Sequence, residues 1–424
     1  MSRKLFIFED DKYDRFFPLT YNRPVYELLC GITKIREKIS HLFTGAEVVL
    51  LCRDYLEKVL ATRTGQEVNQ FEVKKEDEIL LINGRVLPSG DFSEKVNFSN
   101  EERFFFSGDD LIGWTGRGGS LGKYKTFFQS LYVTDQIKSQ KSKLTVTEID
   151  VKPVNYLWDL VSQNEKQIEA DFVRMKPSLD LKNMFKHCQV DDDSLIYETE
   201  KVYIGPGSQI EGQVVLDARS GSIYIGEKVN IQPHTLVKGP CYVGDGSILT
   251  GGKIREGTSI GPVCRVGGEV DNAVFLGYSN KYHEGFLGHA YVGEWVNLGA
   301  LTTNSDLKNN YSTIKVMVNQ ALVDSGLTKV GSFIGDHVKT GIGTLLNTGI
   351  SIGFASNIFG GGMLKLKYIP AFFWGGPELQ EVYEFTKALQ TIRAVMKRRG
   401  VALGGDEENL FKKIYELTEK ERGS

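Results

Sequence analysis

A repeated dipeptide, an aliphatic residue followed by glycine, constrains the fold of this chain more than any other feature of its sequence. The pair recurs between residues 204 and 353, and several pairs are separated by six or by eighteen residues. The thirteen pairs are Ile204-Gly205, Ile225-Gly226, Val243-Gly244, Ile260-Gly261, Val266-Gly267, Leu276-Gly277, Leu287-Gly288, Val292-Gly293, Leu298-Gly299, Val330-Gly331, Ile334-Gly335, Ile342-Gly343 and Ile352-Gly353. Such spacing is typical of repeat architectures, in which one unit is too small to bury a core by itself.

The six-residue period predicts a parallel β-helix over residues 199–375. One aliphatic side chain in each hexapeptide fills the interior, the small residue after it allows a tight corner, and eighteen residues close one triangular coil. Stacked coils then bury a continuous core. The aromatic segment 371–374 is expected to cover the last coil.

The region before the repeat has a different pattern. Because 424 residues are too many for one core, we expect a separate domain over residues 1–150. Short aliphatic runs alternate there with helical patterns, which predicts a Rossmann-like α/β domain with a parallel sheet. The expected strands are residues 5–8, 48–53 and 79–84, and the expected helices are residues 25–39 and 55–64.

Helical segments flank the predicted β-helix. In the connector, residues 151–198, five apolar residues fall on one helical face: Leu157, Leu160, Val161, Ile168 and Phe172. In the tail, residues 376–424, an amphipathic helix is expected over residues 377–400. Its basic end, Lys397 to Arg399, is expected to interact with the helix dipole, with coenzyme A phosphates as the alternative partner.

Composition excludes several classes of protein. With 51 basic and 54 acidic residues the net charge is -3, so charge predicts neither a nucleic-acid nor a membrane partner. The five cysteines are widely spaced and form no Cys-x-x-Cys pair, which is typical of reduced thiols. No apolar run resembles a signal peptide or a transmembrane helix. We therefore expect a cytoplasmic protein.

Polar side chains are crowded into one part of the repeat region, residues 282–313. Three motifs follow one another there: Gly288-His289, then Asn297-Leu-Gly-Ala300, and then Asn304 with Asn310-Tyr311. Their order resembles the acetyltransferase half of the bifunctional glucosamine-1-phosphate acetyltransferase/N-acetylglucosamine-1-phosphate uridylyltransferase family. The resemblance implies a left-handed β-helix, a homotrimer, and acetyl-CoA as co-substrate.

The resemblance also implies roles for individual residues. His289 falls on the catalytic base, Asn297 and Asn304 on the asparagines that contact the sugar and the acetyl group, and Ala300 on the backbone that meets the thioester carbonyl. Weaker matches make Arg265 and Lys281 ligands of the sugar phosphate and bring Asn310 near the site, and Lys365 and Lys367 are further candidates for the phosphates of coenzyme A. This chain has one hexapeptide fewer between His289 and Asn297 than the family, and a tyrosine is lost that Tyr291 or Tyr311 could replace. The other histidines considered, His234, His283 and His337, are expected to be structural.

The chemistry agrees with a histidine at the centre of the site. A sugar amine is mostly ammonium at neutral pH, so a base must remove a proton before the nitrogen attacks a thioester, and imidazole has a suitable pKa. A backbone N–H at the corner near Ala300 is the candidate donor to the oxyanion. The alternative for His289 is an exposed corner residue without a catalytic role.

The first part of the chain has a second, partial resemblance. Arg15-Phe-Phe-Pro-Leu-Thr20, Arg23-Pro24 and Asn83-Gly84-Arg85 resemble motifs of sugar-1-phosphate nucleotidyltransferases. The resemblance implies that Arg15 and Arg23 clamp phosphates, that Asn83 lies near the nucleotide, and that Mg²⁺ is needed if this half is active. The alternative is that the arginines form surface ion pairs and that Asn83-Gly84 is a tight turn.

Three departures from that family concern the chemistry itself. Residues 9–14 contain four carboxylates and no glycine, Arg85 stands at the family's metal-binding aspartate, and Val25 replaces a lysine.

The two resemblances together predict acetyl-CoA-dependent acetylation of glucosamine-1-phosphate coupled to uridylyl transfer, which gives UDP-N-acetylglucosamine. Two alternatives stay open: a sugar-1-phosphate nucleotidyltransferase using UTP or dTTP whose β-helix serves assembly, and a silent nucleotide-sugar-binding subunit.

Overall fold

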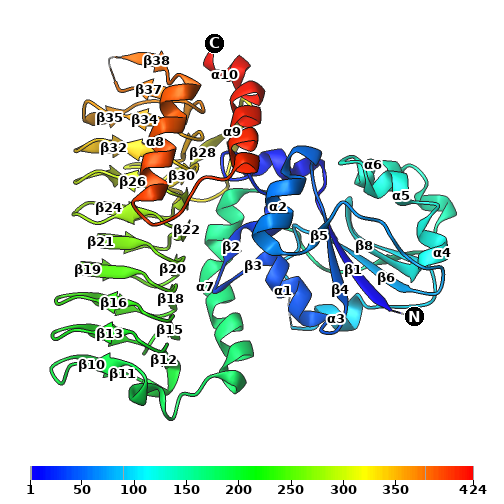
Figure 1. Ribbon diagram of the computed structural model, residues 1–424, viewed down its shortest axis with the longest axis horizontal. Helices are drawn as coiled ribbons and strands as arrows, with labels where there is room; N and C mark the ends of the chain where they lie inside the picture. Colours follow the sequence, from blue (N-terminus) through cyan, green and yellow to red (C-terminus); the bar gives the residue numbers. More distant parts are fainter. Residues whose placement is uncertain (1, 89, 378, 424) are drawn as a thin grey trace.

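The computed structural model describes residues 2–88, 90–377 and 379–423, and it shows an α/β domain beside a tall parallel β-helix (Figure 1). The sheet of the α/β domain has the order β5-β4-β1-β6-β8-β7-β9. β1, β4, β5 and β6 are parallel, whereas β8 runs antiparallel to both β6 and β7. The strands are β1 (Arg3–Phe8), β4 (Glu47–Leu51), β5 (Glu67–Val68), β6 (Glu78–Asn83), β7 (Arg103–Ser107), β8 (Asp110–Arg117) and β9 (Val146–Glu148).

Both faces of this sheet are buried. Leu5 and Ile7 of β1 belong to one hydrophobic cluster, and Phe6 and Phe8 belong to another on the opposite face. Burial on both sides explains why the strands are continuous apolar runs. The helices of the domain are α1 (Ile35–Leu42), α2 (Glu57–Thr64), α3 (Phe92–Lys95), α4 (Gly118–Leu121), α5 (Lys125–Phe128) and α6 (Val133–Lys138).

The predicted helix over residues 25–39 is only partly present. A hairpin of β2 (Leu29–Cys30) and β3 (Thr33–Lys34) precedes α1, because Gly31 turns the chain with a φ of +83°. The N–H of Gly31 donates to Asn164 Oδ1 (2.6 Å), and that of Ile32 donates to Asp171 Oδ2 (2.9 Å). Side chains of the connector thus satisfy backbone groups that a helix would have used.

The connector is α7 (Leu157–Met175), and it lies between the two large parts of the chain (Figure 1). Its five predicted apolar residues are all buried, as is Trp158. Its contacts include β2 of the α/β domain and three strands of the β-helix, β18 (Cys241–Val243), β20 (Thr258–Ile260) and β25 (Tyr291–Glu294). The repeat begins at β10 (Gln189–Val190), earlier in the chain than residue 199.

The β-helix is left-handed and has three faces. The first face contains β10 (Gln189–Val190), β13 (Gln209–Ile210), β16 (Asn230–Ile231), β19 (Ile248–Ile254), β21 (Arg265–Asp271), β23 (Asn280–Lys281), β26 (Asn297–Leu298), β31 (Lys339–Thr340), β34 (Asn357–Ile358) and β37 (Phe373–Gly375). The second face contains β12 (Val202–Ile204), β15 (Ile223–Ile225), β18 (Cys241–Val243), β20 (Thr258–Ile260), β22 (Val274–Gly277), β25 (Tyr291–Glu294), β30 (Ser332–Ile334), β33 (Ile350–Ile352) and β36 (Tyr368–Ile369).

The third face is formed by β11 (Leu195–Tyr197), β14 (Val215–Asp217), β17 (Leu236–Lys238), the ends of β19 and β21, β24 (Phe286–Gly288), β27 (Thr303–Asn304), β32 (Thr344–Leu346) and β35 (Gly362–Leu364). Between β27 and β30 the chain leaves the repeat and forms the hairpin β28 (Lys315–Val318) and β29 (Ala321–Asp324). The aliphatic residues of the repeat form one interior cluster. This confirms the predicted architecture.

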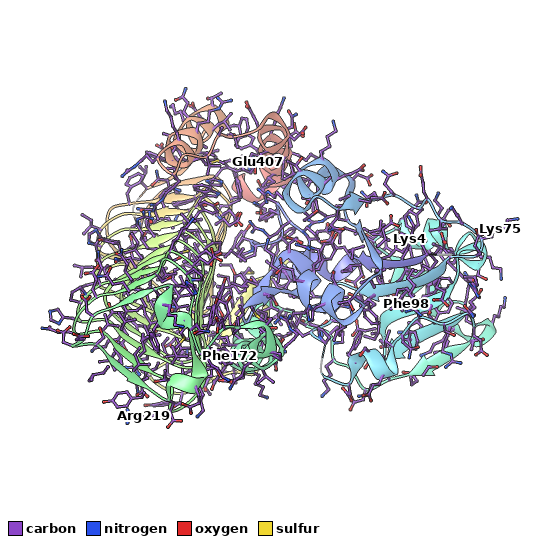
Figure 2. All side chains as sticks on the ribbon, turned by 60° about the horizontal axis from the view of Figure 1, so that its bottom comes forward. Lys4, Lys75, Phe98, Phe172, Arg219 and Glu407 are labelled. Carbon is purple, nitrogen blue, oxygen red and sulfur yellow. The ribbon has the colours of Figure 1, made fainter. Side chains whose placement is uncertain are left out.

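The second face packs against the α/β domain. Val274, Leu276 and Phe333 share a hydrophobic cluster with residues of that domain, and Tyr291 donates its hydroxyl to the carbonyl of Leu29 at 2.8 Å. Tyr291 is therefore buried between the two parts, away from the first face. The two parts form one continuous body (Figure 2).

The tail differs from its prediction at the start. The helix α8 (Phe385–Lys397) begins later than residue 377, because β38 (Gln380–Val382) first pairs antiparallel with β37 and covers the last strand of the first face. α9 (Gly405–Leu417) and α10 (Glu419–Arg422) follow. Within the described residues, no helix has the length and apolarity needed to cross a membrane.

Candidate functional site

A cavity of about 650 Å³ lies on the first face, between the strands β21, β23 and β26 and the helix α8. Arg265, Asn280 and Asn297 occupy the same position on successive coils, because they are register partners along this face. Their side chains line the cavity, whereas the next residues along each strand point into the prism. Asn280 Nδ2 donates to Asn297 Oδ1 at 3.2 Å, and Arg399 Nη2 donates to Asn280 Oδ1 at 2.7 Å.

The cavity is strongly positive. Arg265, Arg398 and Arg399 line it, and no Asp or Glu is found among its described lining residues. Burial and the neighbouring charges of Arg265 and Arg398 lower the pKa of Arg399. Arg265 Nη1 is buried without a hydrogen-bond partner. Guanidinium groups without a carboxylate partner form a site that suits a phosphate group.

The side chain of Lys339 forms another part of this lining. Its Nζ donates to the carbonyls of Trp295 and His337, both at 2.8 Å, and burial lowers its pKa to about 7. A lysine with that pKa is partly neutral at neutral pH. The cavity therefore contains both fixed positive charge and one group that can change charge.

His283 also lines the cavity, and the sequence prediction missed it. Because Asn280 pairs with Asn297, the same register brings His283 level with Ala300, which lines the cavity as well. The imidazole is exposed and stands edge-on to Tyr282 at 5.5 Å between ring centroids. The seventeen-residue offset between Asn280 and Asn297 is the signal that could have identified it, because it differs from the eighteen-residue repeat.

Lys281 points away from this cavity and into the prism. Its Nζ donates to the carbonyl of Gly267 at 2.8 Å and to that of His283 at 3.2 Å, and burial lowers its pKa to about 8. Lys281 therefore supports the corner that carries His283. Its role as a ligand of the sugar phosphate stays a prediction, and it would require a different side-chain direction.

His289 lies on another edge of the prism, at the corner between the third and second faces. Its Nδ1 is 2.8 Å from Asp306 Oδ2, and its backbone has a φ of +47°. Asn304 lies beside it, but its amide is engaged with the backbone of Gly288 through two hydrogen bonds of 2.8 Å. His289 and Asn304 are thus brought together. Asn297 lies on the first face, and neither of these two residues shares its cavity.

The remaining predicted residues of the β-helix are dispersed. Asn310 lies in the excursion between β27 and β30, where its Oδ1 accepts from the N–H of Ser312 at 3.2 Å, and Tyr311 is exposed. Lys365 is exposed on the last coils, and Lys367 donates to Thr348. Their roles stay predictions, since none of them lines the cavity on the first face.

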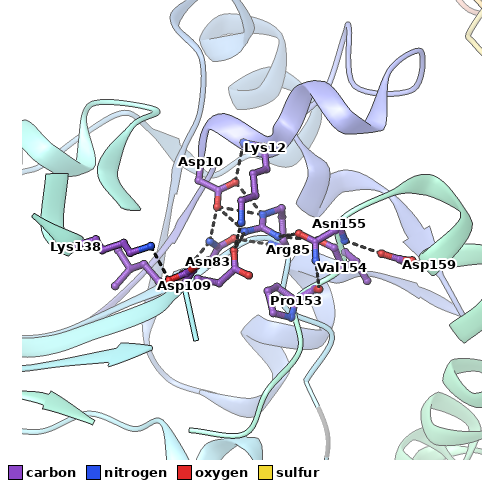
Figure 3. Close-up of polar contacts among 12 residues, drawn as sticks. Asp10, Lys12, Asn83, Arg85, Asp109, Lys138, Pro153, Val154, Asn155 and Asp159 are labelled. Carbon is purple, nitrogen blue, oxygen red and sulfur yellow. Dashed lines mark hydrogen bonds and ion pairs between the residues drawn. The ribbon is translucent and has the colours of Figure 1, made fainter. Parts of the chain in front are cut away.

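The predicted nucleotide-binding residues lie around the carboxyl edge of the α/β sheet. Asn83 is buried, and its Nδ2 donates to Asp10 Oδ2 at 2.9 Å and to the carbonyl of Leu111 at 3.0 Å (Figure 3). The guanidinium of Arg15 lies 5.6 Å from the ring centroid of Tyr156. Of these residues, Arg15 is the one that is partly exposed.

Arg23 is buried in ion pairs with the β-helix. Its Nη2 lies 2.6 Å from Asp336 Oδ2 and 2.9 Å from Glu294 Oε2. In the structure it joins the two parts of the molecule. A role as a phosphate clamp stays a prediction that would require these ion pairs to open.

The edge that would hold Mg²⁺ is occupied by cationic side chains. Asp10 and Asp110 are both paired with Arg85, and Lys12 pairs with Asp110. No cluster of three or more potential metal ligands of the His, Cys, Asp and Glu types occurs in the described ranges. Mg²⁺ prefers oxygen ligands free of competing cations, so the residues present do not fit it.

Comparison with known proteins agrees with this description of the two parts. Residues 5–178 match the protein-family model described as sugar nucleotidyl transferase. The amino-terminal part of the chain is therefore similar to sugar nucleotidyl transferases over this range. The matched range includes α7.

Curated relatives of this chain are named as bifunctional proteins. A bifunctional sugar-1-phosphate nucleotidylyltransferase/acetyltransferase from Sulfurisphaera tokodaii is 34% identical over 23% of this chain and 24% of its own length. The bifunctional protein GlmU of Acidithiobacillus ferrooxidans is 32% identical over 38% of this chain and 34% of its own length. The chain thus spans about a quarter to a third of these relatives.

A likeness to solved structures is weaker. A mutant of AntD, an N-acyltransferase from Bacillus cereus in complex with dTDP and coenzyme A, is 14% identical, with 50% of this chain and 90% of that chain covered and a TM-score of 0.15.

Proposed function

We propose that this protein transfers an acetyl group from acetyl-CoA to the amine of glucosamine-1-phosphate, in the cavity on the first face. The observation that carries the proposal is one cavity that contains an exposed imidazole, two asparagines and three arginines without a carboxylate. The arginines suit the sugar phosphate or the phosphates of coenzyme A. The names of the bifunctional relatives support the same reaction class.

In this proposal His283 is the general base. The imidazole takes a proton from the sugar ammonium, and the free amine attacks the thioester carbonyl. The tetrahedral intermediate then loses its second N–H proton and expels the thiolate of coenzyme A, which takes up that proton, so the products are the amide and the thiol. A backbone N–H near Ala300 would donate to the oxyanion. His283 is favoured over the sequence prediction, His289, because it shares a cavity with Asn297 and Ala300.

The test is release of the coenzyme A thiol from acetyl-CoA, followed with a thiol reagent, in the presence and absence of glucosamine-1-phosphate. We expect release that depends on the acceptor and saturates with it, and glucosamine without the phosphate should give a much higher KM. Thiol release at the same rate with and without glucosamine-1-phosphate would contradict the proposal. Equal KM values for the two acceptors would contradict the role of the arginines in binding the sugar phosphate.

A second candidate function belongs to the amino-terminal domain, and the family match over residues 5–178 favours it. It is nucleotidyl transfer from UTP or dTTP to a sugar-1-phosphate, which would turn the acetylated product into UDP-N-acetylglucosamine. Pyrophosphate release with a panel of sugar-1-phosphates tests it. Nucleotide-sugar binding without turnover in either assay would instead support a silent binding subunit.

Two further proposals concern the state of the protein. We propose a homotrimer, which the resemblance to the acetyltransferases supports, and light scattering of the purified chain tests it. We also propose a cytoplasmic location, because the five cysteines are all free thiols and their spacing suits a reducing compartment. Cell fractionation would contradict the second proposal if the protein were found outside the cytoplasm.

A further inference from the structure

The carboxyl edge of the α/β sheet contains two carboxylates that share one cation. Asp10 follows β1 and Asp110 begins β8, and these strands lie on either side of β6. Arg85, which follows β6, has its Nη2 2.8 Å from Asp10 Oδ2 (Figure 3). The same nitrogen lies 2.7 Å from Asp110 Oδ1. One nitrogen atom therefore bridges the two carboxylates.

A second cation completes the charge balance. Lys12 Nζ lies 2.5 Å from the same oxygen of Asp110 that accepts from Arg85. Two positive side chains thus face two negative ones. The side chains of Arg85 and Asp10 are each 1% exposed, and burial at that depth is tolerated only when the charges are paired and hydrogen-bonded.

This edge is also where a nucleotide-binding sheet of this topology would bind its ligand. The chain passes from β1 to β4 on one side and returns to β6 on the other, so the loops after β1 and β6 diverge there. A divalent cation between two carboxylates would lie about 2.0–2.1 Å from its oxygen ligands. The guanidinium of Arg85 occupies that space between Asp10 and Asp110.

We propose that Arg85 and Lys12 together take the place of a divalent cation in this domain, so that its sheet edge binds neither Mg²⁺ nor Mn²⁺. The two side chains supply the charge of such an ion from within the chain. Any nucleotide or sugar phosphate that binds here does so without a metal ion at Asp10 and Asp110.

The guanidinium of Arg85 is held too firmly to act as a movable gate. Nε donates to Asp10 Oδ1 at 2.9 Å, and Nη1 donates to the carbonyl of Val154 and to Asn155 Oδ1, both at 2.9 Å. All five N–H groups of the guanidinium therefore have acceptors. The last two acceptors precede α7, so the internal cation also ties the sheet edge to the connector.

Binding of Mn²⁺ to the full chain tests the proposal without turnover, so its outcome is separate from that of acetyl transfer. The signal of free aqueous Mn²⁺ is followed by electron paramagnetic resonance during titration of the wild type and of Asp110→Asn. We expect the two proteins to give the same titration curve. One equivalent of Mn²⁺ bound by the wild type and lost in Asp110→Asn would overturn the proposal.

A double variant tests whether the two cations stand in the place of the ion. Arg85→Met with Lys12→Met leaves both carboxylates uncompensated, and we expect it to bind Mn²⁺ at least tenfold more tightly than the wild type. A double variant that retains its circular dichroism spectrum and does not bind Mn²⁺ would contradict the substitution.

If the double variant does not fold, a single substitution can be tested instead. Lys12 is 20% exposed, so Lys12→Met removes one charge with little loss of packing, and Lys138→Met removes the neighbouring lysine that pairs with Asp109. Because Arg85 stays between the carboxylates, we expect Lys12→Met alone to strengthen Mn²⁺ binding less than the double variant does, by several-fold. Equal binding by the two single variants would contradict the role of Lys12.

Discussion

His283 and His289 differ in what their imidazoles can reach. The ring of His289 is held by Asp306 on the edge between the third and second faces, whereas the ring of His283 is exposed in the cavity with Asn297. A carboxylate partner orients a histidine, but a general base must first lie within reach of the proton that it removes. Location therefore favours His283 as the base.

Exchange of each histidine separates the two assignments. We expect His283→Ala to lower kcat for acetyl transfer by about 10²- to 10⁴-fold, because a positioned base contributes on that order. His289→Ala should retain most of the activity. His234→Ala, which changes another exposed corner histidine, is the matched control. A fully active His283→Ala variant with a collapsed His289→Ala variant of unchanged Tm would restore the sequence assignment.

Lys339 makes stability depend on pH. Its pKa is about 7 in the folded protein and lies near 10.4 in an unfolded chain, so between these values the unfolded state binds the extra proton. Stability from this group therefore rises as pH increases from 7. We expect Lys339→Met to reduce the gain in unfolding free energy between pH 7 and pH 9 by about 2 kcal/mol. Urea denaturation at the two pH values measures it, and an unchanged gain would contradict the assignment.

At the scale of the element, side chains of α7 form hydrogen bonds with both the β2–β3 hairpin and the β-helix. Asn164 is fully buried, accepts from the N–H of Gly31, and donates to the carbonyl of Gly257 at 2.8 Å and to Ser259 Oγ at 2.9 Å. One amide thus joins the α/β domain, the connector and the β-helix. The side chain cannot be shortened without leaving buried polar groups unpaired.

We expect Asn164→Ala to lower the free energy of unfolding by about 2–4 kcal/mol, because at least one buried donor and one buried acceptor lose their partner. Gln163→Ala, on the exposed side of the same helix, is the control and should change stability by less than about 0.5 kcal/mol. Equal effects of the two changes in urea denaturation would show that the amide has no special role.

Elements that follow from a local sequence pattern could be predicted. Elements that depend on contacts between residues far apart in the sequence could not. The β-helix follows from a period that each hexapeptide repeats, and α7 follows from its apolar face. The hairpin of β2 and β3 depends on Asn164 and Asp171, more than 130 residues away in sequence. His283 depends on a coil of seventeen residues, and the partners of Arg85 depend on which strands flank β6. The spacing of Asn280 and Asn297 contains the first of these two signals, but residue spacing does not show which strands flank β6.

At the scale of the whole molecule, buried ion pairs fasten the two parts together. Arg23 of the α/β domain reaches Asp336 and Glu294 of the β-helix, and the side chain of Asp336 is 1% exposed. A carboxylate at that depth is tolerated because of its partner. The interface therefore depends on charge as well as on apolar packing.

We expect Arg23→Met to destabilise the protein by about 3–5 kcal/mol, since it leaves a buried carboxylate unpaired. The double variant Arg23→Met with Asp336→Asn should recover part of that loss, because the unpaired charge is gone. Urea denaturation measures both. If the double variant were less stable than Arg23→Met alone, the unpaired charge would not be the cause.

The shared interface has a consequence for an intermediate that passes between the two proposed reactions. The cavity lies on the first face, whereas the second face is covered by the domain that carries the sheet edge. A common hydrophobic cluster and buried ion pairs hold the two parts in this arrangement. An acetylated sugar released from the cavity would therefore diffuse through solvent before reaching the second domain, and an added enzyme that consumes this intermediate would intercept it.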